Sequence, residues 1–235
     1  MAPEAVVLAA GEGRRMRPVS ERWAKPVLPV DGRPVIGTLL RNLAEAGVER
    51  AAIVTGYLAE QVEALVGNGS AFGVEATFVR QPEPLGSADA VLQAVRAGTR
   101  APFLVTAADT VFARGDLRRF LTESAGVAGA IAGRRTPPPS PPHRRPLRIV
   151  DGRVERVLDE DPGNPIGGAP LWLLGPAVAA YLEPLPGKPP YELATVFQLA
   201  IDAGEEIAGI EVGPTRDLTA PLDLVAENFP YLGGT

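Results

Sequence analysis

The chain has 235 residues, of which 46% are hydrophobic, so it is long enough to bury one large core. Its formal net charge of -5 argues against nucleic acid or an anionic membrane as the main partner. The absence of cysteine excludes disulfide bonds and thiolate zinc sites, and a single histidine, His143, leaves little basis for a serine–histidine triad. The N-terminus lacks the basic region of a signal peptide and no apolar run has the length of a membrane span, so we expect a cytoplasmic protein.

In the first half of the chain, short β-like runs alternate with amphipathic helical stretches. This alternation is typical of α/β folds with a mostly parallel sheet. Apolar runs predict strands over residues 5–10, 51–55, 74–79 and 103–107. Helical spacing predicts helices over residues 34–46, 59–66 and about 87–97. We expect Gly47 to end the first of these helices and Ser87 to cap the start of the third.

The pattern changes after residue 133. Five prolines within residues 136–142 exclude a regular helix or a central strand, so we interpret this segment as a surface excursion. The dipeptide Asp151-Gly152 lies between β-rich runs and predicts a two-residue hairpin turn. We further expect strands over residues 147–150, 154–158, 171–174 and 207–212, and helices over about 176–183, 191–203 and 220–229.

A glycine- and arginine-rich segment follows the first predicted strand. From Leu8 to Pro18 it reads Leu-Ala-Ala-Gly-Glu-Gly-Arg-Arg-Met-Arg-Pro. Gly11 and Gly13 would let backbone N–H groups approach phosphate oxygens. Arg15 and Lys25 would add positive charge where a triphosphate needs neutralising. The glycines alone fit an ordinary loop with solvated arginines equally well.

Two common phosphate motifs do not fit this segment, since Met16 replaces the third glycine of a dinucleotide fingerprint and no Gly-Lys-Ser/Thr closes a P-loop. The whole segment, followed by Lys25-Pro26, instead resembles the signature of the sugar-phosphate nucleotidyltransferases, the nucleotide-sugar pyrophosphorylases. That signature is Leu-Ala-Ala-Gly-x-Gly-x-Arg-Met, then a spacer and Lys-Pro. The resemblance implies that Arg15 is the catalytic arginine and that Lys25 binds phosphate in the transition state. It also implies a triphosphate held by the loop residues Leu8, Ala10, Gly11 and Gly13.

A second segment, over residues 81–91, resembles the family's Gln-x-x-x-x-Gly-Thr-Ala-x-Ala motif. The amide of Gln81 can offer a donor and an acceptor together to a pyrimidine edge. Gly86 would admit the base closely, and Ser87 keeps a hydroxyl where the family has threonine. By itself this segment is a loop followed by a capped helix, but its pairing with the first motif favours nucleotide binding.

Two aspartates resemble the metal ligands of the family. Asp109 follows the strand predicted over 103–107, at the carboxyl edge of the sheet where α/β proteins bind ligands. Asp217 opens a segment that resembles the family's closing Asp-x-x-Thr-Pro-x-Asp-Leu, although Ala220 shifts the threonine by one place. Two carboxylates can hold one Mg²⁺ when water and phosphate oxygens complete its coordination, so the resemblance implies Mg²⁺ as the cofactor. Either aspartate alone would be more typical of a turn or a helix cap.

The acceptor side resembles the family less closely. Glu160 matches the second glutamate of the family's Glu-Glu-Lys-Pro stretch, which bonds sugar hydroxyls. Asp161 replaces the lysine that follows, and Gly168 stands at the place of the sugar-binding asparagine. Because Asp161 would repel an acceptor phosphate, Arg144 and Arg145 are candidate acceptor-binding cations; solvated surface arginines are the competing interpretation.

The resemblance implies a Rossmann-like, GT-A-like α/β fold of three layers with a mixed, mostly parallel sheet. We expect one domain over residues 1–235, with a nucleotide-binding part over 1–133 and an acceptor-binding part with a β-rich insertion over 134–235. The C-terminal acyltransferase or β-helix domain of some relatives is expected to be absent.

The implied reaction transfers a nucleotide from UTP, dTTP or CTP to a sugar 1-phosphate and releases pyrophosphate, with no nucleic acid or membrane partner. A cytidylyl- or guanylyltransferase for a cyclitol phosphate, phosphocholine or a phosphonate is one alternative. A non-catalytic nucleotide-sensing subunit and a plain dinucleotide-binding domain are the others. The sequence leaves the oligomeric state open, a homo-oligomer included.

Overall fold

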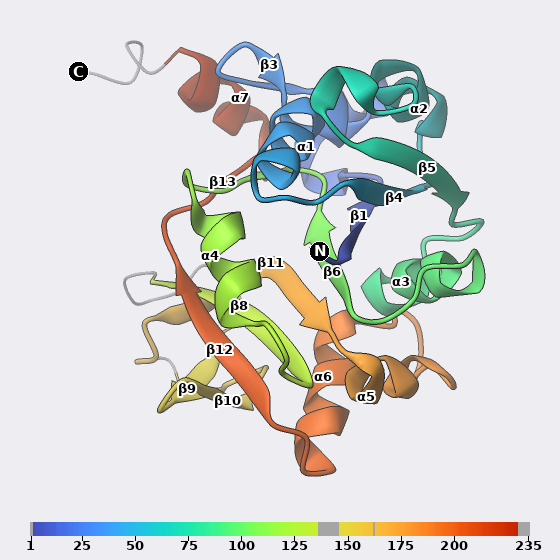
Figure 1. Ribbon diagram of the computed structural model, residues 1–235. Helices are drawn as coiled ribbons and strands as arrows, with labels where there is room; N and C mark the ends of the chain where they lie inside the picture. The colour runs from blue at the N-terminus through green and yellow to red at the C-terminus, as the bar shows by residue number, and fades with distance from the viewer. Residues whose placement is uncertain (1, 136–145, 162, 230–235) are drawn as a thin grey trace.

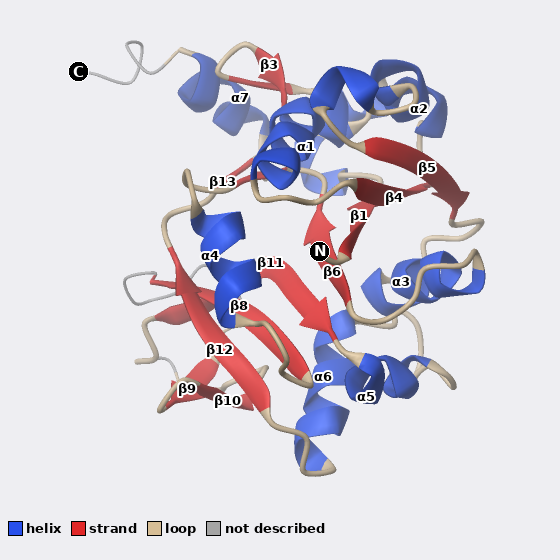
Figure 2. Cartoon of the chain, viewed as in Figure 1, coloured by secondary structure: helices blue, strands red, loops and turns tan. Residues whose placement is uncertain are grey.

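The computed structural model describes residues 2–135, 146–161 and 163–229. Within them, nine strands form one mixed sheet, drawn in Figures 1 and 2. Their spatial order is β5 (Glu75–Arg80), β4 (Arg50–Thr55), β1 (Glu4–Ala9), β6 (Phe103–Ala107), β11 (Ile166–Leu174), β8 (Gly129–Arg135), β12 (Ile207–Val212), β10 (Arg153–Arg156) and β9 (Arg148–Val150). β11 and β10 run against the direction of the other strands, so the sheet is mixed and mostly parallel, as predicted.

Helices cover both faces of the sheet. Because successive strand residues point to opposite faces, Val7 of β1 enters one core and Val6 enters the other. The first core is closed by α1 (Val35–Glu45), α2 (Ala59–Val66) and α4 (Asp116–Glu123); the second is closed by α3 (Ser87–Arg96), α5 (Pro176–Ala179) and α6 (Leu193–Asp202). The predicted three-layer α/β architecture is therefore confirmed, and the layers are visible in Figure 1.

Most elements lie where hydrophobic spacing predicts them. β6, α2 and β12 have the predicted bounds; β4 and α3 differ from them by one residue at one end, and β1, β5 and α1 by one residue at each end. The predicted hairpin is β9–β10, with Asp151 at φ 49° and Gly152 at φ 75°. Two left-handed residues in succession are what a type I′ turn requires, which explains the Asp-Gly pair.

Two elements of more than three residues, α4 and β8, are missing from the sequence prediction for residues 1–135. β8 is nevertheless central, because it lies between β11 and β12. It reads Gly-Ala-Ile-Ala-Gly-Arg-Arg and contains a single β-branched residue, so neither composition nor alternation marks it as a strand. The expected division at 133/134 falls inside β8, and β9–β10 extends the same sheet beyond β12. The β-rich second half is therefore continuous with the sheet of the first half.

Two short ladders lie outside the main sheet. β2 (Pro29–Val30) pairs with β3 (Arg33–Pro34), and β7 (Thr110–Val111) pairs with β13 (Arg216–Asp217). The second ladder sets Asp217 opposite Thr110, which brings the closing segment to the end of β6. α7 (Pro221–Asn228) follows this ladder.

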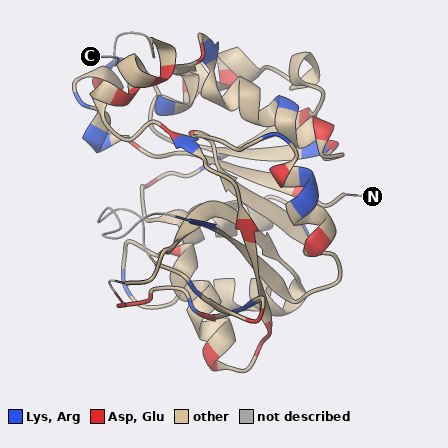
Figure 3. Ribbon diagram, turned by 90° about the vertical axis from the view of Figure 1, so that its left-hand side faces the viewer, with Lys and Arg blue, Asp and Glu red and all other residues tan. Residues whose placement is uncertain are grey.

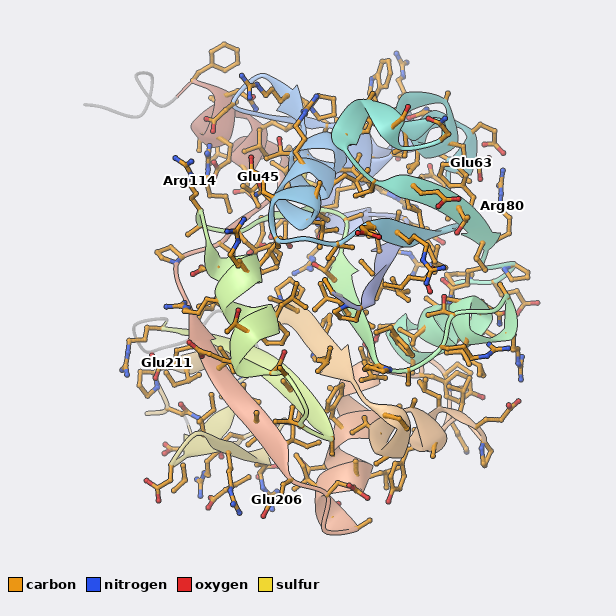
Figure 4. The ribbon with its side chains drawn as sticks, viewed as in Figure 1. Glu45, Glu63, Arg80, Arg114, Glu206 and Glu211 are labelled. Atoms are coloured by element: carbon orange, nitrogen blue, oxygen red, sulfur yellow. The ribbon has the colours of Figure 1, made fainter. Side chains whose placement is uncertain are left out.

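Charged residues lie mainly on helices and loops (Figure 3), and the neighbouring strands β6 and β11 in the middle of the sheet contain none. At the edge of the sheet, Arg80 of β5 pairs with Glu63 of α2 at 3.0 Å, and Figure 4 shows both at this edge. None of the helices in the described part of the chain has the length and apolar character needed to cross a membrane.

Candidate functional site

Two neighbouring cavities open at the carboxyl end of β1 and β6. The first, of about 420 Å³, is lined by the end of β1, the glycine-rich loop and the segment that precedes α3. The second, of about 300 Å³, lies over β8 and β11. Both are lined by Arg15, Lys25, Ala107, Asp109 and Thr219. Three of the residues expected to bind phosphate or metal, Arg15, Lys25 and Asp109, therefore lie where the two cavities meet.

The glycine-rich loop lines the first cavity. A Cβ atom on Gly11 would meet no protein atom within 4 Å, so the fold itself does not require glycine there. The open space beside Gly11 lets a ligand approach the backbone closely. Met16 anchors the loop. Its side chain is fully buried, and its backbone N–H donates to the Gly13 carbonyl at 2.7 Å.

The arginines of this loop are not equivalent. Arg14 donates to Glu12 at 2.7 Å, and this hydrogen bond lowers the pKa of the Glu12 carboxyl. Arg17 lies 3.9 Å from the same carboxylate. Arg15 is exposed, and its guanidinium bonds no described residue while it lines both cavities. It is thus the arginine of this loop that remains available to an anionic ligand.

Lys25 and Asp109 form an ion pair across the junction of the cavities. Their side chains are 15% and 25% exposed, so the pair is partly shielded from water. Lys25 lies in a single helical turn (Lys25–Val27), and Asp109 lies between β6 and β7.

Asp217 lies next to this pair. It accepts hydrogen bonds from Arg134 Nη1 at 2.6 Å, from Thr110 Oγ1 at 2.9 Å and from Thr215 Oγ1 at 3.1 Å. Thr110 Oγ1 is also 3.4 Å from Asp109 Oδ1, so one hydroxyl lies between the two carboxylates that were predicted as metal ligands.

The donor set fits a magnesium ion. Mg²⁺ prefers oxygen ligands and is usually bound by one or two carboxylates together with substrate phosphates and water. No group of three or more His, Cys, Asp or Glu side chains suited to a metal occurs among the described residues. Asp109 and Asp217 could therefore hold the ion, and phosphate and water oxygens would complete its coordination.

Sequence reasoning missed Arg134. This residue of β8 lines the second cavity, and its side chain is 8% exposed. Arginine is rarely this buried unless it is paired, and Asp217 is its partner. The signal in the sequence was an arginine that follows the apolar run from Ala130 to Ala132 after one intervening residue, Gly133.

On the other side of the first cavity, Gln81 is 8% exposed. Its Nε2 donates to the Gly86 carbonyl at 3.0 Å and to Asp89 Oδ2 at 2.7 Å. The expectation that Gln81 offers a donor and an acceptor together is therefore wrong, because both N–H groups are used inside the protein.

One further expectation for this segment, the capping role of Ser87, is corrected. Ser87 does not cap its own helix, since Gly86 holds the N-cap position of α3. The Ser87 hydroxyl instead accepts from the Leu193 N–H and donates to Glu192, each at 2.8 Å, so it binds the start of α6. Gly86 has φ +112°, and a Cβ there would lie 2.6 Å from the Tyr191 nitrogen. The fold thus requires glycine at this position whether or not a base lies beside it.

The predicted acceptor residues are only partly brought together. Gly168 of β11 lines the second cavity. Glu160 is exposed and does not line it. The buried carboxylate beside it is Asp159; burial acts to raise the pKa of Asp159, but hydrogen bonds from Asn164 and Arg148 outweigh it and lower the pKa. Asp161 is exposed and accepts from the Gly163 N–H at 2.8 Å. Arg144 and Arg145 lie outside the described residues.

The chain matches known proteins in sequence and in fold. Residues 4–139 match the model of the family described as nucleotidyl transferase. An N-acetylmuramate alpha-1-phosphate uridylyltransferase of Neisseria meningitidis is 40% identical over 111 residues, which cover 46% of this chain and 47% of the relative. A glucose-1-phosphate thymidylyltransferase of Streptomyces griseus is 30% identical over 233 residues, 96% of this chain and 65% of the relative. The matched regions thus span about half and about two thirds of these two relatives.

Among solved structures, the inositol-1-phosphate CTP transferase from T. maritima superposes with a TM-score of 0.81. The match covers 94% of this chain and 91% of that one at 20% identity. At this identity the likeness concerns the fold, which agrees with the predicted nucleotidyltransferase architecture.

Proposed function

Since the chain belongs to the nucleotidyl transferase family, we propose that it is a nucleotidyltransferase that transfers a nucleoside monophosphate from a pyrimidine nucleoside triphosphate to a phosphorylated acceptor, releasing pyrophosphate. The observation that carries this proposal is the junction of the two cavities. One cavity is lined by the glycine-rich loop and suits a triphosphate; the other suits a second substrate. Arg15, Lys25 and Asp109 line both, at the place where the two substrates would react.

In the proposed reaction, an oxygen of the acceptor phosphate attacks the α-phosphorus in line. The new phosphorus–oxygen bond forms as the bond to the β-phosphate oxygen breaks, and the electron pair leaves with pyrophosphate. Phosphoryl and nucleotidyl transfers depend mainly on positioning and on charge stabilisation. A phosphate monoester is largely ionised near neutral pH, since its second pKa is about 6, so no general base is needed.

The chain's own residues then have separate tasks. Backbone N–H groups at Gly11 and Gly13 bind the triphosphate, and Arg15 stabilises the charge that develops on the leaving pyrophosphate. Lys25, which pairs with Asp109, would contact phosphate. Asp109 and Asp217 would hold Mg²⁺, which supplies positive charge between the two anionic substrates when it is bound. Arg134 keeps Asp217 oriented from the floor of the second cavity.

We propose a sugar 1-phosphate as the acceptor class. The Neisseria and Streptomyces relatives are named for an N-acetylmuramate 1-phosphate and a glucose 1-phosphate activity, and the Streptomyces relative aligns over 96% of this chain. Trp172 and Gly168 line the second cavity, where an aromatic face and a side-chain-free backbone suit a sugar ring. The named substrate of the T. maritima structure, inositol 1-phosphate, makes a cyclitol phosphate the second candidate. We place the reaction in the cytoplasm.

A pyrophosphate-release assay tests the proposal. Five nucleoside triphosphates are each combined with sugar 1-phosphates, inositol 1-phosphate, phosphocholine and a phosphonate, with and without Mg²⁺. The proposal predicts release that needs Mg²⁺, one triphosphate and one acceptor together. Binding of a triphosphate without release for any acceptor would instead indicate a nucleotide-sensing protein.

A further inference from the structure

Asp89 of α3 is a buried carboxylate with two amide partners. The residue is 5% exposed and does not line the first cavity. Its Oδ2 accepts from Gln81 Nε2 at 2.7 Å, and its Oδ1 accepts from Gln93 Nε2 at 3.1 Å. Burying a carboxylate costs free energy, so a position of this kind calls for a reason beyond helix packing.

The partners of Gln81 fix which way its amide points. A backbone carbonyl can only accept a hydrogen bond, and an ionised carboxylate likewise only accepts. The Gly86 carbonyl and Asp89 therefore both require the nitrogen of Gln81, and they use its two hydrogens. Oε1 of Gln81 accepts no hydrogen bond from any described residue, so it is the polar atom of this side chain that remains for a ligand in the first cavity.

Gln81 lies at the end of the first cavity where the base of a bound triphosphate would lie. Gln81, Pro84 and Gly86 line the first cavity but not the second, whereas the cations Arg15 and Lys25 line both. A triphosphate whose phosphates lie at the cations extends its base toward the uncharged end, where Gln81 is found. This step rests on the proposed function.

We propose that Asp89 is a positioning residue that fixes Gln81 as a hydrogen-bond acceptor, so that among pyrimidine triphosphates the site selects UTP and dTTP over CTP. The ring N3 of uracil and thymine carries a hydrogen that Gln81 Oε1 can accept. The ring N3 of cytosine is itself an acceptor, and two facing acceptors repel each other. Rotating the Gln81 amide to suit cytosine would break both of its hydrogen bonds and leave the Asp89 carboxylate short of a donor.

The first test uses the unaltered protein and needs no turnover. Dissociation constants for UTP, dTTP, CTP and 3-deaza-UTP are measured by equilibrium dialysis with Mg²⁺ and without acceptor. The analogue replaces the N3–H of uracil by a carbon and keeps the ring shape. UTP and dTTP are expected to bind about 10-fold more tightly than CTP and 3-deaza-UTP, the ratio given by 1.4 kcal/mol. Equal affinity for all four would overturn the proposal.

The second test uses the pair Asp89→Ala and Gln93→Ala. Asp89→Ala removes the acceptor that holds Gln81, whereas Gln93→Ala removes the other partner of Asp89 and leaves both bonds of Gln81 in place. The preference for UTP over CTP should fall about 5-fold in Asp89→Ala, a change of about 1 kcal/mol, and stay unchanged in Gln93→Ala. A folded Asp89→Ala protein with full preference would refute the role of Asp89. If this variant does not fold, the comparison of UTP with 3-deaza-UTP decides.

The outcomes also separate this inference from the proposed function. Selective binding of UTP and dTTP without pyrophosphate release for any acceptor would refute the transferase proposal and support base selection. Release of pyrophosphate with UTP and CTP at similar efficiency would support the transferase proposal and refute base selection.

Discussion

Replacing Arg15 with alanine removes a guanidinium that lines both cavities and has no partner among the described residues. Two unit charges 4 Å apart interact by about 1 kcal/mol in water and about 4 kcal/mol at the effective dielectric of a protein surface. Arg15 is exposed at the cavity mouth, so its contribution to the transition state should lie between these limits. A loss of about 2–4 kcal/mol lowers kcat/KM by roughly 30- to 1,000-fold. Because no protein contact is lost, the free energy of unfolding should change by less than about 0.5 kcal/mol.

Arg17→Ala is the matched control. It removes the same charge two residues further along the loop, but Arg17 lines neither cavity and lies 3.9 Å from Glu12. Its kcat/KM for pyrophosphate release should stay within about 3-fold of the parent, since exposed ion pairs contribute less than about 1 kcal/mol. Urea denaturation of both variants gives the stability comparison. If Arg15→Ala retains its activity, or if Arg17→Ala loses as much, the assigned role of Arg15 is wrong.

Asp109→Asn should lower kcat about 100-fold or more and raise the Mg²⁺ concentration for half-maximal rate, because it removes a charge both from the metal site and from the partner of Lys25; an unchanged Mg²⁺ titration would contradict the metal assignment. Gly86→Ala should destabilise the fold by about 2 kcal/mol or more in urea denaturation, since its Cβ would lie 2.6 Å from the Tyr191 nitrogen. The lowered pKa of Asp159 means that its stabilising contribution is present above the unfolded-state pKa of about 3.9 and is lost as pH falls through the folded-state value. The stability difference between the parent and Asp159→Asn should therefore shrink toward low pH, and a difference that grows instead would refute this sign.

The fold was predictable where a single segment carries its own pattern. The run 207–212 contains three β-branched residues, all buried, and the Asp-Gly turn between β9 and β10 has the backbone angles that its residues favour. β8 was not predictable in this way. Its alanines and glycines carry little intrinsic preference, and it is a strand because β11 and β12 pair with it on either side. β8 therefore forms a strand because both of its faces are buried, and not because its residues favour strands.

The candidate site, too, was predictable only where a single segment carries its own pattern. The glycine-rich loop and Gln81 were visible because their chemistry lies in short segments. The contacts that orient them join distant parts of the chain: Arg134 reaches Asp217 over 83 positions, and Ser87 binds Leu193 over 106. A motif gives the residue type at a position, but which atom of an amide remains for a ligand depends on the amide's hydrogen-bond partners. The acceptor role of Gln81 could therefore be inferred only from a structure that places Asp89 beside it.

The balance of charge at the second cavity gives a physical reason for the metal. Among the described residues that line it, three basic side chains face three carboxylates: Arg15, Lys25, Arg134, Asp109, Glu192 and Asp217. This set is close to neutral, whereas a triphosphate and a phosphate monoester would together bring about five or six negative charges. The protein alone leaves the charge of these anions largely unneutralised, because two of its carboxylates already form ion pairs with two of its cations. A divalent ion on Asp109 and Asp217 would add charge between the substrates and release Lys25 toward phosphate. In the proposed mechanism, the metal would therefore enter with the triphosphate and allow an acidic protein to catalyse a reaction between two anions.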